Sequence, residues 1–391
     1  MNGADGPLSG VLVLDLSRVL AGPFCTMLLG DMGARVIKVE HPDGDVTRGW
    51  GPPFEKTSGL SAYYLAVNRN KESIVLDLST AAGADSVRML ARRADVLVEN
   101  FLPGGLEKLG LPLELLRAAN PGLVTASITG FGRTGDDATL PGFDLLAQAG
   151  AGLMAITGAH GGPAKVGVAV SDLFAGLYAL AGILARLRER EATGRGGHVE
   201  VDLFTSTLAS LINVAQAALV TGEEAKRWGN AHPQITPYRP FTASDGDFIL
   251  AVGTDRQFAL LANLVGRPEW GEDPAYRTNA ARVANREALE RALQELFRTR
   301  RREEWIALCR GAGIPSGPVR APLEALTSET ARSLGAVASV DGVEFVASPI
   351  RLPEGTALRF PPKLDEHGDA LRREFGLPFR GPQGRGISDL E

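Results

Sequence analysis

Hydrophobic and polar positions alternate in blocks along the first 130 residues. Five short runs are continuously apolar and predict buried strands, at 10–17, 34–40, 73–78, 95–100 and 123–130. Between them lie the helical patterns 23–33, 80–93 and 112–120. This order predicts an α/β fold, with a Rossmann-like parallel sheet covered by helices and a ligand at the carboxyl ends of its strands.

The second half of the chain follows a different pattern. A strand-like run at 198–204 leads into a helical stretch at 206–222, and a Pro-rich turn, a hairpin and charged amphipathic helices come next. After residue 331 short strands return. We therefore predict a large domain that includes 1–205, a smaller α+β domain of 222–330 and a helical linker of 206–221. The tail 380–391 lacks periodicity and is expected to be disordered.

Composition narrows the function classes. The chain has 391 residues and a net charge of −5, which argues against bulk binding of nucleic acid or of a membrane surface. Its two cysteines, Cys25 and Cys309, lie in apolar patterns and are expected to be buried thiols rather than a disulfide. The first residues show no signal-peptide pattern, so we expect a cytoplasmic enzyme.

The segment 162–191 is the most informative part of the sequence. Asp172 stands immediately before a long helix that is apolar on nearly every side, which predicts a buried helix. A carboxylate there either caps the helix or, in a cleft, serves as a nucleophile. Gly176 and Gly182 each cost about 1 kcal/mol in a helix relative to Ala, so we expect another element to pack closely against them.

Several common sites are not indicated. Glu40 ends the second strand pattern, where a dinucleotide site places its ribose acid, but the first turn SRVLAGPF lacks G-x-G-x-x-G. The sequence contains no P-loop and no G-x-S-x-G elbow. No histidine has metal-ligand spacing, so we expect no metal site.

Gly162, Pro163, Gly167, Asp172 and Gly176 form the pattern G-P-x-x-x-G-x-x-x-x-D-x-x-x-G. This pattern resembles the nucleophile region of the class III CoA-transferases, a family that includes formyl-CoA transferases, succinyl-CoA:dicarboxylate CoA-transferases and α-methylacyl-CoA racemases. Further similar segments keep the family's order along nearly the whole chain, at 13–50, 68–78, 95–111, 126–135, 193–204 and 313–319.

The resemblance implies an activity and a site. The activity is transfer of CoA from an acyl-CoA to a free carboxylic acid through an aspartyl anhydride and an aspartyl-CoA thioester on Asp172. CoA is then a substrate, no cofactor is permanently bound, and two subunits interlock as a homodimer. The C-terminal part returns to the large domain in this family, so 331–391 is expected to join 1–205. The positions that match the family's CoA contacts are Arg18, Val19, Ala21, His41, Lys71, Asn100, Phe101 and Lys108. His41 and Lys108 stand where formyl-CoA transferases carry Arg.

One position separates transferase from racemase. Racemases resemble this chain in the segment 140–150 but carry a His where Phe143 stands, and Phe cannot move a proton. Gln148 is retained, as in the transferases, and both Phe143 and Gln148 are candidate substrate residues. The resemblance therefore favours a transferase; a 2-methylacyl-CoA racemase and a non-catalytic CoA-binding protein are the alternatives.

The loop 222–241 lacks the glycine-rich lid of formyl-CoA transferases and resembles that of the dicarboxylate-type transferases. Within it, Lys226 and Arg227 are candidates to hold a distal carboxylate. His232 and Tyr238 are candidates to face the substrate.

Overall fold

The computed structural model describes residues 6–159, 161–352 and 357–378. The predicted disordered tail lies outside these ranges. The chain divides into two compact units, one made of 1–153, 166–216 and 334–391 and the other of 154–165 and 217–333. The segment 154–165 groups with the second unit, although it lies within the range 1–205 predicted for the large domain.

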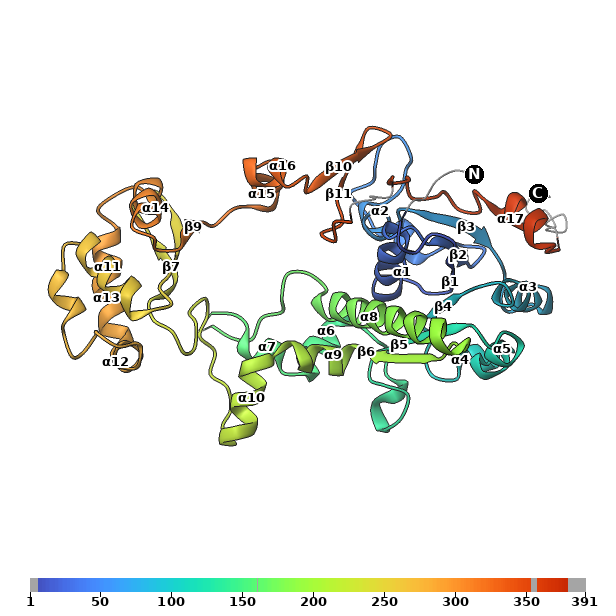
Figure 1. Ribbon diagram of the computed structural model, residues 1–391, viewed down its shortest axis with the longest axis horizontal. Helices are drawn as coiled ribbons and strands as arrows, with labels where there is room; N and C mark the ends of the chain where they lie inside the picture. Colours follow the sequence, from blue (N-terminus) through green and yellow to red (C-terminus); the bar gives the residue numbers. More distant parts are fainter. Residues whose placement is uncertain (1–5, 160, 353–356, 379–391) are drawn as a thin grey trace, which may run out of the picture. The chain divides into compact units, whose positions relative to one another are not determined.

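The first unit is built on a six-stranded parallel sheet with the order β3-β2-β1-β4-β5-β6 (Figure 1). Its strands are β1 (Leu12–Asp15), β2 (Arg35–Glu40), β3 (Lys71–Val75), β4 (Val96–Glu99), β5 (Val124–Thr129) and β6 (His198–Asp202). The predicted strands and the α/β class are confirmed. The strand order reverses between β1 and β4, and open parallel sheets bind their ligands at such a switch point.

Helices cover both faces of this sheet. Alternate strand residues such as Val13 and Val98 pack against α1 (Ala21–Asp31) and α8 (Val170–Thr193). On the other face, residues such as Leu14 and Leu97 pack against α3 (Ala81–Ala91), α5 (Leu113–Ala119) and α17 (Gly368–Phe375). Strands buried on both faces must be apolar at every position, which is why they read as continuous apolar runs.

Helix α8 departs from the sequence prediction in two ways. It begins at Val170, so Asp172 lies in its first turn and is not its N-cap. It is also buried on one side only, since Leu177 and Tyr178 are 43% and 45% exposed in the single chain.

The two helical glycines mark close packing, as predicted. A Cβ on Gly176 would lie 2.7 Å from the Ala21 carbonyl oxygen, and a Cβ on Gly182 would lie 2.5 Å from a methyl group of Val199. Gly176 therefore lets the first turns of α8 touch the start of α1, and Gly182 lets α8 lie against β6.

The second unit has an antiparallel sheet of β7 (Tyr238–Thr242), β8 (Asp247–Ala251) and β9 (Ser316–Pro318). Its core is shared with α11 (Asp255–Leu264), α13 (Arg286–Phe297) and α14 (Arg302–Gly311), and it contains the buried Cys309. Cys25 is buried in the first unit, so both thiols are free and buried, as expected.

The predicted helix at 206–222 is interrupted. The chain forms α9 (Leu203–Ser210) and α10 (Ile212–Thr221), and Ile212, the first residue of α10, has a positive φ of 41°. A β-branched residue in that conformation cannot continue a right-handed helix. The late strand patterns form the hairpin of β10 (Val337–Val340) and β11 (Val343–Val346).

We predict that Gly176→Ala is about 1–3 kcal/mol less stable than Gly150→Ala, because both gain the helix preference of Ala but only the methyl group at Gly176 overpacks a contact, the one with α1. Gly150→Ala is the matched control, since its Cβ would meet only ordinary contacts at 3.8 Å. Urea unfolding followed by circular dichroism measures both variants. Equal midpoints would show that the contact at Gly176 yields at little cost.

Candidate active site

A cavity of about 480 Å³ opens at the carboxyl ends of the strands on both sides of the switch point. Arg18 and Val19 line it after β1, Asn100 and Phe101 after β4, and the segment 141–145 beyond β5. Asp172 and Ala169 line it from the start of α8. The cavity therefore lies where an open parallel sheet binds its ligand.

Asp172 is the central carboxylate of the cavity. Burial raises its pKa from the ordinary value to about 7, and the neighbouring charge of Asp144 adds to the rise. The backbone N–H of Ala21 opposes the rise by donating a hydrogen bond to the carboxylate. Ala21 is the first residue of α1, and its N-cap Leu20 provides no side-chain cap. Asp172 thus lies near the first N–H of α1 and does not cap its own helix.

Asp144 is a second carboxylate in the same cavity, on the short helix α6 (Asp144–Gly150). One of its oxygens accepts a hydrogen bond from the Ser171 N–H at 2.9 Å, and the other accepts one from the Gln148 amide at 2.8 Å. Asp144 therefore caps the first turn of α8 from outside while facing Asp172.

Gln148 supports the site from behind. It is fully buried, does not line the cavity, and accepts a hydrogen bond from the Val166 N–H at 2.8 Å. Its amide also donates to the Val168 carbonyl at 3.3 Å. Gln148 thus fixes Asp144 and the chain that leads into α8.

Five of the predicted CoA contacts are brought together at the cavity: Arg18, Val19, Ala21, Asn100 and Phe101. The Asn100 side chain accepts from the Arg18 N–H at 2.9 Å and donates to the Arg18 carbonyl at 2.7 Å, which joins the ends of β1 and β4. The exposed Arg18 guanidinium lies 4.9 Å from the centre of the Phe101 ring. It makes no ion pair with any carboxylate in the described part of the chain.

The structure does not bring Lys71 to this cavity. Its ammonium lies inside the first unit, 3.0 Å from Asp15, 2.9 Å from the Pro23 carbonyl and 3.0 Å from Asn68. Burial lowers the pKa of Lys71 to about 8, against the opposing charge of Asp15. All three of its donors are used within the protein.

His41 and Lys108 are exposed but do not line the cavity. The His41 ring lies 3.2 Å from the Asp43 carboxylate. Lys108 ends the short helix α4 (Gly105–Lys108) that follows β4. Glu40, at the place of a ribose acid, is buried and bound to Arg48 and Ser73.

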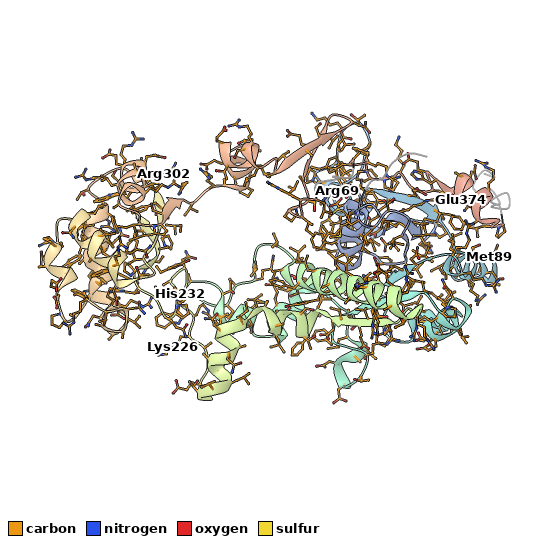
Figure 2. All side chains as sticks on the ribbon, viewed as in Figure 1. Arg69, Met89, Lys226, His232, Arg302 and Glu374 are labelled. Atoms are coloured by element: carbon orange, nitrogen blue, oxygen red, sulfur yellow. The ribbon has the colours of Figure 1, made fainter. Side chains whose placement is uncertain are left out.

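The candidate substrate residues divide between the units. Phe143 is 61% exposed and lines the cavity. Arg227, His232 and Tyr238 belong to the second unit, on the segment whose Lys226 and His232 are labelled in Figure 2. Within that unit the Arg227 guanidinium donates to the Ala155 carbonyl at 3.1 Å, and the rings of His232 and Tyr238 lie 5.3 Å apart.

Two aromatic residues that the sequence analysis missed also line the cavity. Trp50 and Tyr63 meet edge to face with their ring centres 5.1 Å apart. Burial raises the pKa of Tyr63 to about 12, and the charges of Asp172 and Asp144 add to the rise. Tyr63 is therefore a neutral hydroxyl near both carboxylates. Its short helix α2 (Ala62–Val67) carries no local signal beyond its N-cap Ser61.

A carboxyl group with a raised pKa in a cavity at a switch point is typical of an α/β enzyme site. The chain belongs to CoA-transferase family III, whose family model matches residues 8–368. Members of this family are enzymes. Among the described residues no cluster of three or more His, Cys, Asp or Glu side chains is placed to hold a metal ion.

Individual relatives agree with this assignment. The chain is 41% identical to the succinyl-CoA:glutarate CoA-transferase of Mus musculus, over 94% of this chain and 86% of the relative. It is 39% identical to the acetyl-CoA:oxalate CoA-transferase of Acetobacter aceti, over 95% and 97%. The crystal structure of a CAIB/BAIF family protein from Brucella suis matches with a TM-score of 0.86 and 43% identity, over 95% of this chain and 99% of that one.

We predict that Asp172→Asn stabilises the protein by a larger margin at pH 8 than at pH 5. A carboxyl group with a raised pKa binds its proton more tightly in the folded state, so its contribution to stability falls as pH rises towards 7. Asn does not ionise and escapes this loss. Thermal unfolding at both pH values measures the difference, with the exposed Asp136→Asn as control. An equal effect at both pH values would contradict the raised pKa.

Proposed function

We propose that this enzyme transfers CoA from a dicarboxylyl-CoA, such as succinyl-CoA, to a free dicarboxylic acid, with Asp172 as the nucleophile. The observation that carries the proposal is the Asp172 carboxylate at the switch-point cavity, beside the first N–H of α1 and desolvated enough to raise its pKa. A desolvated carboxylate is a stronger nucleophile than a hydrated one.

The first half of the reaction loads CoA onto the enzyme. An Asp172 oxygen attacks the thioester carbonyl, the C–S bond breaks, and CoA leaves as the thiolate. The product is a mixed anhydride. The thiolate then attacks the aspartyl carbonyl, and the donor acid leaves as its carboxylate. An aspartyl-CoA thioester remains, so one difficult exchange is divided into easier steps.

The second half reverses these steps with the acceptor. The acceptor carboxylate attacks the aspartyl thioester, the thiolate leaves again, and a second anhydride forms. Attack of the thiolate on the acceptor acyl carbonyl gives the new acyl-CoA and restores the Asp172 carboxylate. Each tetrahedral intermediate places negative charge on an oxygen, and the Ala21 N–H is a donor available there.

The named relatives support the substrate class. The mouse relative is named for succinyl-CoA and glutarate and the Acetobacter relative for oxalate, so each acts on a dicarboxylate. We place CoA along the cavity wall formed by Arg18, Asn100 and Phe101, where an unpaired guanidinium suits a phosphate. His41 and Lys108 stay proposed contacts of the outer phosphates, and Lys71 is not included.

We also propose an interlocked homodimer, on the family resemblance. The exposed Leu177 and Tyr178 on α8 suit a surface that a partner covers. Sedimentation equilibrium is expected to give twice the chain mass of 41.3 kDa. A monomer mass would exclude this assembly.

Incubation with succinyl-CoA is expected to load Asp172 covalently. Hydroxylamine converts an aspartyl anhydride or thioester to a hydroxamate, and peptide mass spectrometry then locates it. The adduct should occur on the peptide with Asp172, persist in Asp144→Asn and vanish in Asp172→Asn. Transfer to glutarate should exceed transfer to butyrate. The absence of an adduct with several acyl-CoAs would overturn the proposal.

Deuterium exchange distinguishes the racemase alternative in the same samples. A racemase incorporates solvent deuterium at the α-carbon of 2-methylacyl-CoA without any acceptor acid. We expect none, because no histidine lines the cavity within the described residues and Phe143 occupies the wall beside Asp144. Incorporation without transfer would assign a racemase instead. CoA binding with neither reaction would assign a binding protein.

Activity is expected to rise with pH along a limb centred near 7, since the reactive form of Asp172 is the anion and its pKa is about 7. Asp144→Asn removes a repelling charge and should move this limb of kcat/KM to lower pH. The profile is measured between pH 5 and 9 with succinyl-CoA and glutarate. A limb that stays in place would show that Asp144 does not act on Asp172.

A further inference from the structure

The turn between β1 and α1, residues 17–19, has its backbone held by side chains from three other segments. The Ser17 carbonyl accepts from the Lys38 ammonium at 3.0 Å. Both polar backbone groups of Arg18 bind the Asn100 amide. The Val19 N–H donates to an Asp45 carboxylate oxygen at 3.3 Å. So dense a set of contacts on one short turn indicates a conformation that the chain does not adopt by itself.

Val19 is the strained residue of this turn. Its φ is 70°, in the left-handed region that β-branched residues rarely occupy. Two residues later α1 begins at Ala21, whose N–H faces the Asp172 carboxylate. The conformation of Val19 therefore sets the direction in which the first N–H of α1 points.

Asp45 is the side chain best placed to hold Val19. The oxygen that accepts from Val19 also accepts from the Lys38 ammonium at 3.0 Å, and the other oxygen accepts from the Thr47 N–H and hydroxyl at 3.0 and 2.8 Å. Burial acts to raise the pKa of Asp45, but Lys38 and Thr47 hold it at about 2. The Asp45 carboxylate is thus held as an anion, and each of these hydrogen bonds to its oxygens comes from an N–H, O–H or ammonium donor.

We infer that Asp45 is a positioning residue for the transferase reaction: it holds Val19 in the left-handed conformation and so aims the Ala21 N–H at Asp172. The inference rests on the proposed role of Asp172. Asp45 does not line the cavity, so it acts only through the turn.

The direction in which the pKa of Asp172 moves when Asp45 is changed distinguishes this positioning role from a long-range effect of the Asp45 charge. Losing the Ala21 hydrogen bond raises the pKa of Asp172, because that bond favours the anion. Losing the negative charge of Asp45 through space would lower that pKa instead. The groups that face Asp172 from the packed elements are Asp144 on α6 and Tyr63 on α2, and neither is changed.

The first test compares Asp45→Glu and Asp45→Asn with the wild type. Asp45→Glu keeps a negative charge for Lys38 but displaces the carboxylate from the Val19 N–H. Asp45→Asn keeps the shape of the side chain but replaces one acceptor oxygen by an NH2 group, which then faces another hydrogen-bond donor. In both, the ascending limb of kcat/KM should move about half a unit to higher pH, which lowers the rate at pH 6 about threefold. Asp45→Glu is informative even where Asp45→Asn does not fold.

Val19→Gly provides the rescue. Glycine adopts positive φ without strain, so the turn no longer needs Asp45 to hold it. Val19→Gly combined with Asp45→Glu should return the limb to its wild-type position, whatever it does to the KM for CoA. The control is Thr47→Val, which removes a hydroxyl bound to Asp45 but leaves the contact with Val19 and should leave the limb in place. The inference would be overturned if the ascending limb of kcat/KM stayed in place in both Asp45 variants. It would also be overturned if Val19→Gly did not return the limb of Asp45→Glu to its wild-type position.

A readout without catalysis keeps this result separate from the proposed function. The pKa of folded Asp172 is also reported by the pH above which the stabilisation by Asp172→Asn stops growing, because that stabilisation begins at the unfolded-state pKa and levels off at the folded-state pKa. Introducing Asp172→Asn into the Asp45→Glu background should move that pH upwards. If it moves while succinyl-CoA gives no adduct in the wild type, the positioning holds and the reaction assignment fails. If the adduct forms and this pH stays fixed, the positioning fails alone.

Discussion

The close approach of two helix starts is the constraint on which the site depends. Gly176 allows the first turns of α8 to touch the Ala21 carbonyl, and this contact places Asp172 at the first N–H of α1. Any larger residue at Gly176 would separate the two helices. The carboxylate would then lose its donor and become more hydrated. The packing of α8 on α1 and the position of the Asp172 carboxylate thus depend on the same backbone contact. This contact requires glycine at position 176, which lowers the helix stability of α8 relative to alanine.

The sequence allowed the sheet and its helices to be predicted because both signals are local. Buried parallel strands must be apolar on both faces, and β1 to β5 therefore stand out as apolar runs. Asp172 was predicted as a candidate through its place before an apolar helix and through the family resemblance, and the structure places it at the switch-point cavity. The contact of its carboxylate with the Ala21 N–H was not predicted. Ala21 lies 151 positions earlier in the sequence, and no periodicity indicates that the two residues meet. Asp144 and Tyr63 escaped assignment for the same reason.

Lys71 shows where residue type alone misleads. A lysine in a family motif suggests a phosphate contact, but this ammonium is buried against Asp15 beneath the carboxyl ends of the strands. Lys38 and Asp45 form a second buried pair beside it. Leaving any one of these charges unpaired would be costly, so the pairs fix one another's positions. In the sequence Asp15, Lys38, Asp45 and Lys71 are far from one another or unrelated by pattern. In the fold they form two buried ion pairs next to the turn at Val19.

The electrostatics of Asp172 fit its proposed role as a nucleophile, a group that would lose its charge when it is acylated. Burial and Asp144 disfavour the anion, and both penalties end when the carboxylate becomes a neutral anhydride or thioester. The Ala21 N–H acts in the opposite sense and keeps the anion populated near neutral pH. A site with only the first two influences would hold a protonated, unreactive carboxyl group, and one with only the third would hold a stable, sluggish anion. The pKa of about 7 marks the balance between them. At a pKa near 7 a substantial share of Asp172 is ionised at neutral pH, and the anion is still destabilised enough to favour its acylation.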